Sequence, residues 1–210
     1  MTTASRERWT KLWHEIGAKD DGLAVYEELV SLYSEPHRHY HNLLHIDECL
    51  NEFESARSLA QQPSAVELAI WFHDAVYDTH AANNEEKSAE LAQKRIVDAK
   101  AGGELCASVF ALVMATRTHD PSLHADAPLL VDIDLSILGK PAERFWEYEA
   151  QIRHEYEWVP EATFATKRAE ILEGFLRRKR IYSTDQFFDR YEKQARANIQ
   201  TSLQKLKSKT

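Results

Sequence analysis

Cysteine is scarce in this sequence, and long hydrophobic runs are missing from it. The 210 residues include two cysteines, Cys49 and Cys106, and both lie in stretches where apolar residues recur at helical spacing. This pattern favours reduced core thiols over a disulfide framework. No apolar run approaches the length of a membrane span, and the first residues lack the apolar segment of a signal peptide. We therefore expect a cytoplasmic protein that does not enter a membrane.

An excess of basic charge is also missing. The formal net charge is −8 at pH 7. Affinity for nucleic acids comes mainly from basic side chains that neutralise phosphates, so we expect no nucleic acid polymer as a partner. Small anionic ligands remain compatible with this composition through local positive charge. Whether the chain forms a homo-oligomer is left open by the sequence.

Alternation of β-branched and polar residues is scarce, whereas apolar residues recur at helical spacing almost throughout. The chain is long enough for one domain with a real core. We predict an all-α fold and a single domain over 1–210, with a metal-site core at about 37–140 and a C-terminal helical extension at about 141–210. The expected helices lie at about 5–17, 22–34, 42–60, 64–76, 84–101, 104–117, 127–138, 141–157, 161–179 and 184–206.

The most informative pair is His73-Asp74, which follows the apolar run Leu-Ala-Ile-Trp-Phe at 68–72. An imidazole and a carboxylate are costly to bury unless a cation or strong hydrogen bonds compensate them. A bound divalent metal ion would do so. Two further segments carry suitable ligands, His41 and His45 in one and Asp132 and Asp134 in the other.

Each of these features also has a simpler explanation when it is taken alone. A single histidine is more often a packed or capping residue than a metal ligand. His73 and Asp74 can end a helix, and Asp132 can interact with a helix dipole. The combination of three such segments favours a metal site over these separate explanations.

The order His45, His73-Asp74 and Asp134 in a helical chain resembles the HD superfamily of metal-dependent phosphohydrolases. The longer runs resemble an uncharacterised bacterial subfamily of predicted HD phosphohydrolases. The matching segments are Arg-His-Tyr-His-Asn-Leu-Leu-His at 38–45, Asn-Glu-Glu-Lys-Ser at 84–88, Asp-Ile-Asp-Leu-Ser-Ile-Leu-Gly at 132–139 and Arg-His-Glu-Tyr at 153–156. This resemblance extends over most of the chain.

The resemblance implies one divalent metal ion per chain, held by His45, His73, Asp74 and Asp134. The ion can be Mn, Co, Ni, Zn, Mg or Fe, and the sequence does not choose among them. Asp132 is an alternative for the last ligand. If Asp134 binds the metal, Asp132 either orients a ligand or caps a helix.

Two catalytic residues also follow from resemblance. The segment Tyr-His-Asn-Leu-Leu-His at 40–45 is similar to one in cyclic-nucleotide phosphodiesterases, in which the later histidine binds metal and the earlier one donates a proton. This likeness implies that His41 protonates the leaving oxygen. Glu85 resembles an acidic residue that follows the doublet in several HD hydrolases and would orient the attacking water. Glu85 can equally be a first-turn acid favoured by the helix dipole.

Positive side chains next to these segments are candidates for binding phosphate. Guanidinium groups match phosphate oxygens, and Arg38, Arg117 and Arg153 lie beside the proposed site segments. The loop that includes His119 and His124 precedes the segment with Asp132. We expect these two histidines to contact substrate, although they could instead belong to a second metal site.

The predicted function is enzymatic: metal-dependent hydrolysis of a phosphate ester or anhydride in a small phosphorylated metabolite or nucleotide. Bound metal would polarise the phosphate and activate water. One alternative is an HD-type di-iron oxygenase, which needs a second iron and further histidine ligands. The other is a noncatalytic helical module that binds a metal or a nucleotide.

Overall fold

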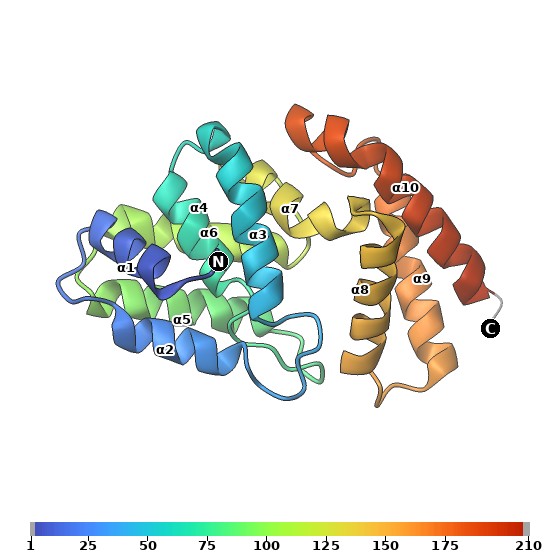
Figure 1. The fold of residues 1–210 in the computed structure, drawn as a ribbon, viewed down its shortest axis with the longest axis horizontal. Coiled ribbons are helices and arrows are strands. Elements are labelled where there is room, and N and C mark those ends of the chain that lie inside the picture. The colour runs from blue at the N-terminus through green and yellow to red at the C-terminus, as the bar shows by residue number, and fades with distance from the viewer. Residues whose placement is uncertain (1–2, 208–210) are drawn as a thin grey trace. The chain divides into compact units, whose positions relative to one another are not determined.

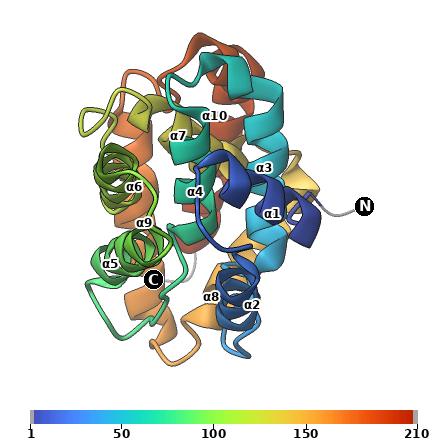
Figure 2. The ribbon, with the colours of Figure 1, turned by 90° about the vertical axis from the view of Figure 1, so that its left-hand side faces the viewer.

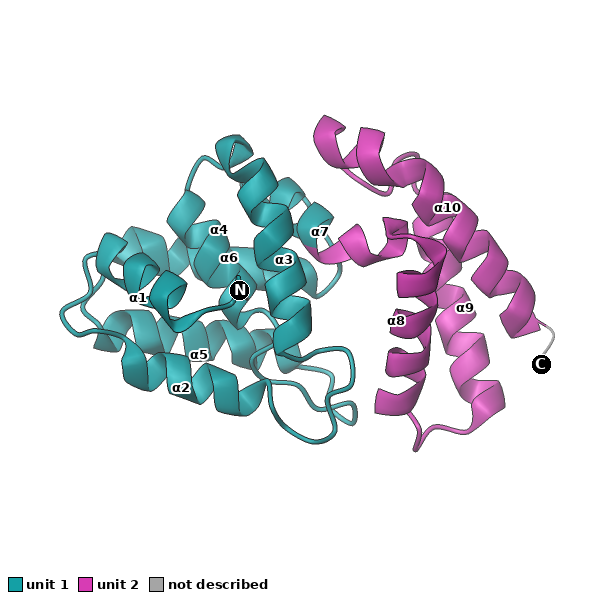
Figure 3. Ribbon diagram, in the orientation of Figure 1, with its two compact units in different colours: residues 1–133 teal, residues 134–210 magenta. Residues whose placement is uncertain are grey.

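A computed structural model describes residues 3–207, and this part of the chain contains ten α-helices, two short 3₁₀-helices and no strand. The all-α prediction is therefore confirmed. The helices fall into two compact units, residues 1–133 and 134–210 (Figure 3). The division lies inside the segment that the sequence assigned to the metal-site core. No helix within residues 3–207 is both long enough and apolar enough to cross a membrane.

The first unit begins with two short helices and continues through the elements that carry most of the candidate ligands (Figure 1). Its elements are α1 (Arg6–Glu15), α2 (Leu23–Leu32), α3 (Leu43–Ala56), η1 (Arg57–Leu59), α4 (Pro63–Phe72), α5 (Asn84–Asp98), α6 (Gly103–Thr116) and α7 (Ala127–Asp134), the last of which ends at the first residue of the second unit. The α5 and α6 helices lie side by side (Figure 2).

The centre of the first unit is α4. Every residue from Ala65 to Phe72 is buried, which explains why this segment is an unbroken apolar run apart from Glu67. The Trp71 ring meets the Trp9 ring of α1 edge to face, with centroids 5.3 Å apart. The helix thus brings its C-terminal end, and the residues after it, to the interior of the unit.

The helix predicted at 64–76 ends earlier, at Phe72. His73 is its C-cap, and the amide of Ala75 donates to the carbonyl of Phe72 at 3.0 Å in a turn. The reason is a contact from elsewhere in the chain, because the guanidinium of Arg38 binds the carbonyls of Asp74 and Ala75. These carbonyls are satisfied without continuing the helix.

The second unit consists of η2 (Leu135–Gly139), α8 (Ala142–Glu155), α9 (Glu161–Arg177) and α10 (Asp185–Lys207). The segment predicted as one helix at 127–138 is α-helical only to Asp134 and then tightens into η2. Side chains of the same unit hold η2: the Tyr182 hydroxyl donates to the carbonyl of Leu135, and the Asn198 amide donates to that of Leu138, both at 2.9 Å.

Candidate metal centre

Three candidate ligands of the first unit converge on one point. His45 lies in the first turn of α3, whose N-cap Asn42 accepts a hydrogen bond from the amide of Leu44. The Nε2 atom of His45 is 3.1 Å from Nε2 of His73 and 3.6 Å from Oδ2 of Asp74. The remaining distance, from His73 Nε2 to Asp74 Oδ2, is 3.0 Å. Both imidazoles are 2% exposed and therefore buried, whereas the Asp74 side chain is 16% exposed.

The orientation of His73 shows which of its nitrogen atoms can bind a metal. Its Nδ1 is 2.9 Å from the carbonyl oxygen of Ile70, which can only accept, so Nδ1 carries the hydrogen. In the neutral ring the lone pair then lies on Nε2, the atom that faces His45 and Asp74. Histidine ligands commonly use their second nitrogen in this way, because a backbone acceptor fixes the tautomer and the ring orientation.

The spacing of the three atoms fits a shared cation. Ligand atoms about 2.0 to 2.2 Å from a metal are about 2.8 to 3.6 Å apart when the angle between them is right or tetrahedral. The observed separations of 3.0, 3.1 and 3.6 Å lie at or near this range. His45, His73 and Asp74 could therefore hold a metal ion with little movement.

The electrostatics of Asp74 favour its ionised form. Burial alone would raise the pKa of this carboxyl group. The positive charges of His73 and His41, together with hydrogen bonds from His45 and His73, outweigh that effect and hold the pKa of Asp74 well below its ordinary value. A carboxylate is the form that binds a cation, and the imidazole ligands must give up their own positive charge when a metal takes its place beside Asp74.

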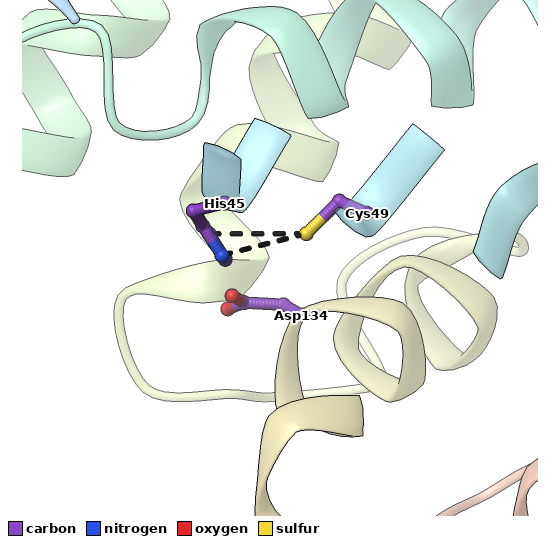
Figure 4. Close-up of side chains that lie close together, drawn as sticks. All are labelled: His45, Cys49 and Asp134. Carbon is purple, nitrogen blue, oxygen red and sulfur yellow. Dashed lines mark hydrogen bonds between the residues drawn. The ribbon is translucent and has the colours of Figure 1, made fainter. Parts of the chain in front are cut away.

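Asp134 is the last residue of α7, and the residues before it in that helix belong to the first unit. It forms a group of potential ligands with His45 and Cys49, whose ligand atoms all lie within 4.8 Å of one another. Figure 4 shows the Asp134 carboxylate pointing towards the His45 ring. Asp132 belongs to neither of the two groups of potential ligands, and its side chain is fully buried in α7.

Arg38 lies next to the doublet but does not face an open site. Its side chain is fully buried, and its guanidinium donates to the carbonyls of His41, Asp74 and Ala75 at 3.1, 2.6 and 2.8 Å. A further bond, at 2.9 Å, joins it to the carboxylate of Glu35. The structure thus makes Arg38 a positioning residue, whereas the sequence predicted a contact with substrate.

His41 lies beside the ligand cluster. Its ring centroid is 5.9 Å from that of His45 and 4.3 Å from that of Tyr77. Tyr40 packs edge to face against it at 4.9 Å, so aromatic rings from two segments contact the imidazole. Its charge also contributes to the low pKa of Asp74. The side chain is therefore close to the candidate ligands without belonging to either ligand group.

Glu85 lies in the first turn of α5 and is half-buried. The same helix is tied to the chain just after the doublet, because the Ser88 hydroxyl accepts from the amide of Val76 at 3.0 Å and donates to its carbonyl at 3.3 Å. This contact anchors the start of α5 to the turn that follows Asp74. The role of Glu85 in orienting water stays a prediction.

The loop between α6 and α7 carries three further candidates. Arg117 is exposed at the end of α6, and His119 adopts a positive φ of 50°. The Nδ1 atom of His124 accepts from the amide of Asp126 at 3.0 Å, so this ring helps to shape the loop. In the described part of the chain, no group of three or more potential ligands includes His119 or His124. Their contact with substrate stays a prediction.

Arg153 belongs to the second unit. Its guanidinium donates to the carbonyls of Tyr156 and Val159, the latter at 3.0 Å, and lies 4.8 Å from the ring centroid of Phe164. These contacts hold the connection between α8 and α9. They give Arg153 a structural role within that unit, and its predicted contact with phosphate remains untested.

Cys49 is the residue that the sequence interpretation missed. The sequence predicts a reduced core thiol, and in the structure Cys49 is buried and forms no disulfide. Its position four residues after His45 on α3 nevertheless places the two side chains on one helix face. That spacing was visible in the sequence and was the signal that could have identified it.

Comparisons of the chain with models of known protein families, with curated proteins and with solved structures returned no match.

Proposed function

We propose that this chain is a metal-dependent phosphohydrolase of the HD superfamily that acts on a small phosphorylated metabolite or nucleotide. The observation that carries the proposal is the convergence of two buried imidazole Nε2 atoms and one carboxylate oxygen at 3.0 to 3.6 Å. The order of His45, His73-Asp74 and Asp134 in the sequence supports the same assignment.

The residues that would hold the metal are His45, His73, Asp74 and Asp134, with one divalent ion per chain. Two nitrogen and two oxygen donors suit zinc, manganese, iron, cobalt or nickel better than they suit calcium. When bound, such an ion polarises a phosphate oxygen and lowers the pKa of water near it.

The neighbouring residues have separate roles in this proposal. Arg38 holds the backbone around Asp74 and that of His41 in fixed relative positions, because its guanidinium donates hydrogen bonds to three of their carbonyls. His41, held between aromatic rings, donates a proton to the leaving oxygen. Glu85 orients water, and Arg117, His119 and His124 bind the phosphorylated substrate from the loop that precedes α7.

The di-iron alternative needs more histidine ligands than the described residues assemble. The second group of potential ligands shares His45 with the first and adds Cys49 and Asp134, without a further histidine. This composition supports a single ion over a pair. We further propose a reducing, cytoplasmic environment, because Cys49 and Cys106 are both buried and neither forms a disulfide.

The proposal is tested by metal analysis of protein purified without added metal, followed by a hydrolysis screen with the metal found. The screen covers phosphomonoesters, nucleotides and phosphoanhydrides. We expect turnover by the wild-type protein and loss of both metal and turnover in Asp74→Asn. Asp98→Asn is the matched control, because this exposed carboxylate at the end of α5 lies in neither ligand group.

Two results would contradict the proposal. Full metal content in Asp74→Asn would show that Asp74 is not needed to hold the metal and would contradict the proposed site. Stoichiometric metal without hydrolysis of any substrate in the screen would instead identify a noncatalytic metal-binding module.

A further inference from the structure

The ring of Tyr77 packs against His41, the residue proposed to donate a proton. The two ring centroids are 4.3 Å apart and the ring planes differ by 30°, so the rings lie against each other at a modest tilt. Tyr40, the sequence neighbour of His41, instead meets the imidazole edge to face at 4.9 Å. Tyr77 is half-buried and lies in the segment that follows Asp74. A side chain beyond the doublet thus contacts the imidazole.

The chain on both sides of Tyr77 is fastened to α5. On one side, the hydroxyl of the buried Ser88 bonds both main-chain groups of Val76, at 3.0 and 3.3 Å. On the other side, the carboxamide of Asn84 accepts from the amide of Asp78 at 3.2 Å and donates to its carbonyl at 2.9 Å. The backbone that carries the Tyr77 ring is therefore held in place by one helix.

Tyr77 also contacts the residues that precede His41. The central guanidinium carbon of Arg38 lies 5.5 Å from the centroid of the Tyr77 ring, within the range of a cation–π contact. The carbonyl of Tyr77 accepts a hydrogen bond from Nε2 of His37 at 3.0 Å. Tyr77 thus contacts the segment 37–41 at three of its residues, and these contacts restrict the movement of the imidazole.

We propose that Tyr77 is a positioning residue for His41, and that its ring fixes the imidazole in the orientation in which it gives a proton to the leaving oxygen. This inference rests on the proposed function. It adds a residue that neither the sequence pattern nor the resemblance to HD proteins assigns.

The ring of Tyr77 acts through His41 and exchanges no proton. In the reaction, the oxygen of water forms a bond to phosphorus, and the bond from phosphorus to the leaving oxygen breaks. The leaving oxygen takes the proton of His41, which regains one from solvent, and solvent takes up the proton of the attacking water. A reacting group displaced by about 1 Å can slow such a step by about 10²-fold. A phenyl ring should hold the imidazole as well as a phenol does, whereas an aliphatic side chain should not.

The first experiment measures steady-state kinetics of the wild-type protein, Tyr77→Phe and Tyr77→Leu with alkyl and aryl phosphates. In Tyr77→Leu, kcat for alkyl phosphates should fall roughly 10- to 100-fold with little change in KM, and aryl phosphates should lose much less. Metal content should stay full, and Tyr77→Phe should resemble the wild-type protein. Tyr26→Leu is the matched control, because Tyr26 is also half-buried and packs edge to face on Trp71.

A double-mutant cycle separates positioning from a general structural role. If Tyr77 acts only through His41, adding Tyr77→Leu to His41→Gln should change the rate for alkyl phosphates by less than about twofold, because residues that act as a unit are not additive. A general structural role would instead lower the rate in both backgrounds and for both classes of substrate.

NMR of the metal-free protein gives a readout that does not depend on activity. The ring protons of His41, assigned by comparison with His41→Gln, lie within the ring current of Tyr77. Their chemical shifts should change in Tyr77→Leu and should stay close to the wild-type values in Tyr77→Phe and Tyr26→Leu.

The outcomes separate this inference from the proposed function. Unchanged His41 shifts in Tyr77→Leu, or an unchanged ratio of alkyl to aryl rates, overturn the inference and leave the metal centre in place. Loss of metal in Tyr77→Leu also overturns it, because Tyr77 would then act on the ligands. No hydrolysis by the wild-type protein overturns both. If Tyr77→Leu does not fold, Tyr77→Met replaces it, because the longer flexible side chain fills the space without a ring.

Discussion

The guanidinium of Arg38 donates a hydrogen bond to the main-chain carbonyl of Asp74, with Nη1 and the oxygen 2.6 Å apart. The same nitrogen also binds the carbonyl of His41 at 3.1 Å. One buried cation therefore joins the segment before α3 to the turn after α4. His45 lies just after the first of these segments, in α3, and His73 caps the end of α4. The hydrogen bonds from Arg38 therefore fix the positions of these two candidate ligands relative to each other.

The first prediction concerns Arg38→Lys. An ammonium group cannot bind the three carbonyls with the geometry of the planar guanidinium, so at least one carbonyl loses its partner. We expect metal affinity to fall roughly 10- to 100-fold. The free energy of unfolding should decrease by about 1 to 3 kcal/mol. Metal titration and urea unfolding measure the two effects.

Arg6→Lys is the control for this substitution, because the ion pair of Arg6 with Glu27 is exposed. Exposed pairs of this kind contribute little, so both measurements should stay close to the wild-type values. Wild-type metal affinity in Arg38→Lys would show that the link between the two segments does not position the ligands.

The second prediction separates proton donation from metal binding. His41→Gln should retain full metal content, because His41 lies in neither ligand group. Its rate of hydrolysis should fall by about 10²- to 10⁴-fold for alkyl phosphates, whose leaving oxygen needs a proton. Aryl phosphates that release a stable anion should lose much less. Steady-state kinetics with both classes of substrate, together with metal analysis, test this expectation.

His154→Gln controls for the general effect of replacing a histidine, since His154 is exposed in the second unit. An equal loss for both classes of substrate would argue against proton donation by His41. A loss of metal in His41→Gln would make it a ligand.

The helices could be predicted from the sequence because each carries its own periodic pattern of apolar residues. Their ends were harder to place, since contacts from distant residues decide them. The end of α4 depends on hydrogen bonds from Arg38. The change from α-helix to 3₁₀-helix after Asp134 accompanies hydrogen bonds from Tyr182 and Asn198. Nothing near residues 73–76 or 135–138 signals these partners.

The candidate site, like the helices, could be predicted from the sequence only in part. His73-Asp74 was singled out by its residue types and position, and the resemblance to HD proteins implied that it binds a metal together with His45; the structure brings these three ligand atoms together. Arg38 was predicted to contact substrate, and in the structure its guanidinium binds backbone carbonyls; a sequence cannot show which of the two a guanidinium faces. Cys49 was missed because a thiol in an apolar helix has an ordinary explanation as a core residue.

The third prediction concerns alkaline pH and the second unit. Burial raises the pKa of the Tyr148 hydroxyl, although the charge of Arg168 acts in the opposite direction. An unfolded tyrosine ionises near pH 10, whereas the folded one stays protonated to higher pH. Its contribution to stability is therefore complete below about pH 10 and is lost as the pH rises through the folded pKa.

Tyr148→Phe tests this expectation. The variant should lose about 1 to 2 kcal/mol at neutral pH, because the hydroxyl also accepts a hydrogen bond from Arg168 at 2.7 Å. Between pH 9 and 11 the free energy of unfolding of the variant should then fall less steeply with pH than that of the wild-type protein. The difference in slope should be on the order of that of one titrating group. Identical slopes in urea unfolding across this interval would contradict the assignment.

The last prediction decides which aspartate of α7 completes the site. Asp134→Asn should weaken metal binding roughly 10- to 100-fold while leaving the stability of the metal-free protein nearly unchanged. Asp132→Asn should do the reverse. The Asp132 side chain is fully buried and belongs to neither ligand group, so its replacement should lower the free energy of unfolding by about 1 to 3 kcal/mol and leave metal affinity intact. Zinc titration and urea unfolding of both variants provide the comparison. If Asp132→Asn loses the metal and Asp134→Asn keeps it, the ligand is Asp132, and α7 must rotate or shift along its axis when the metal binds.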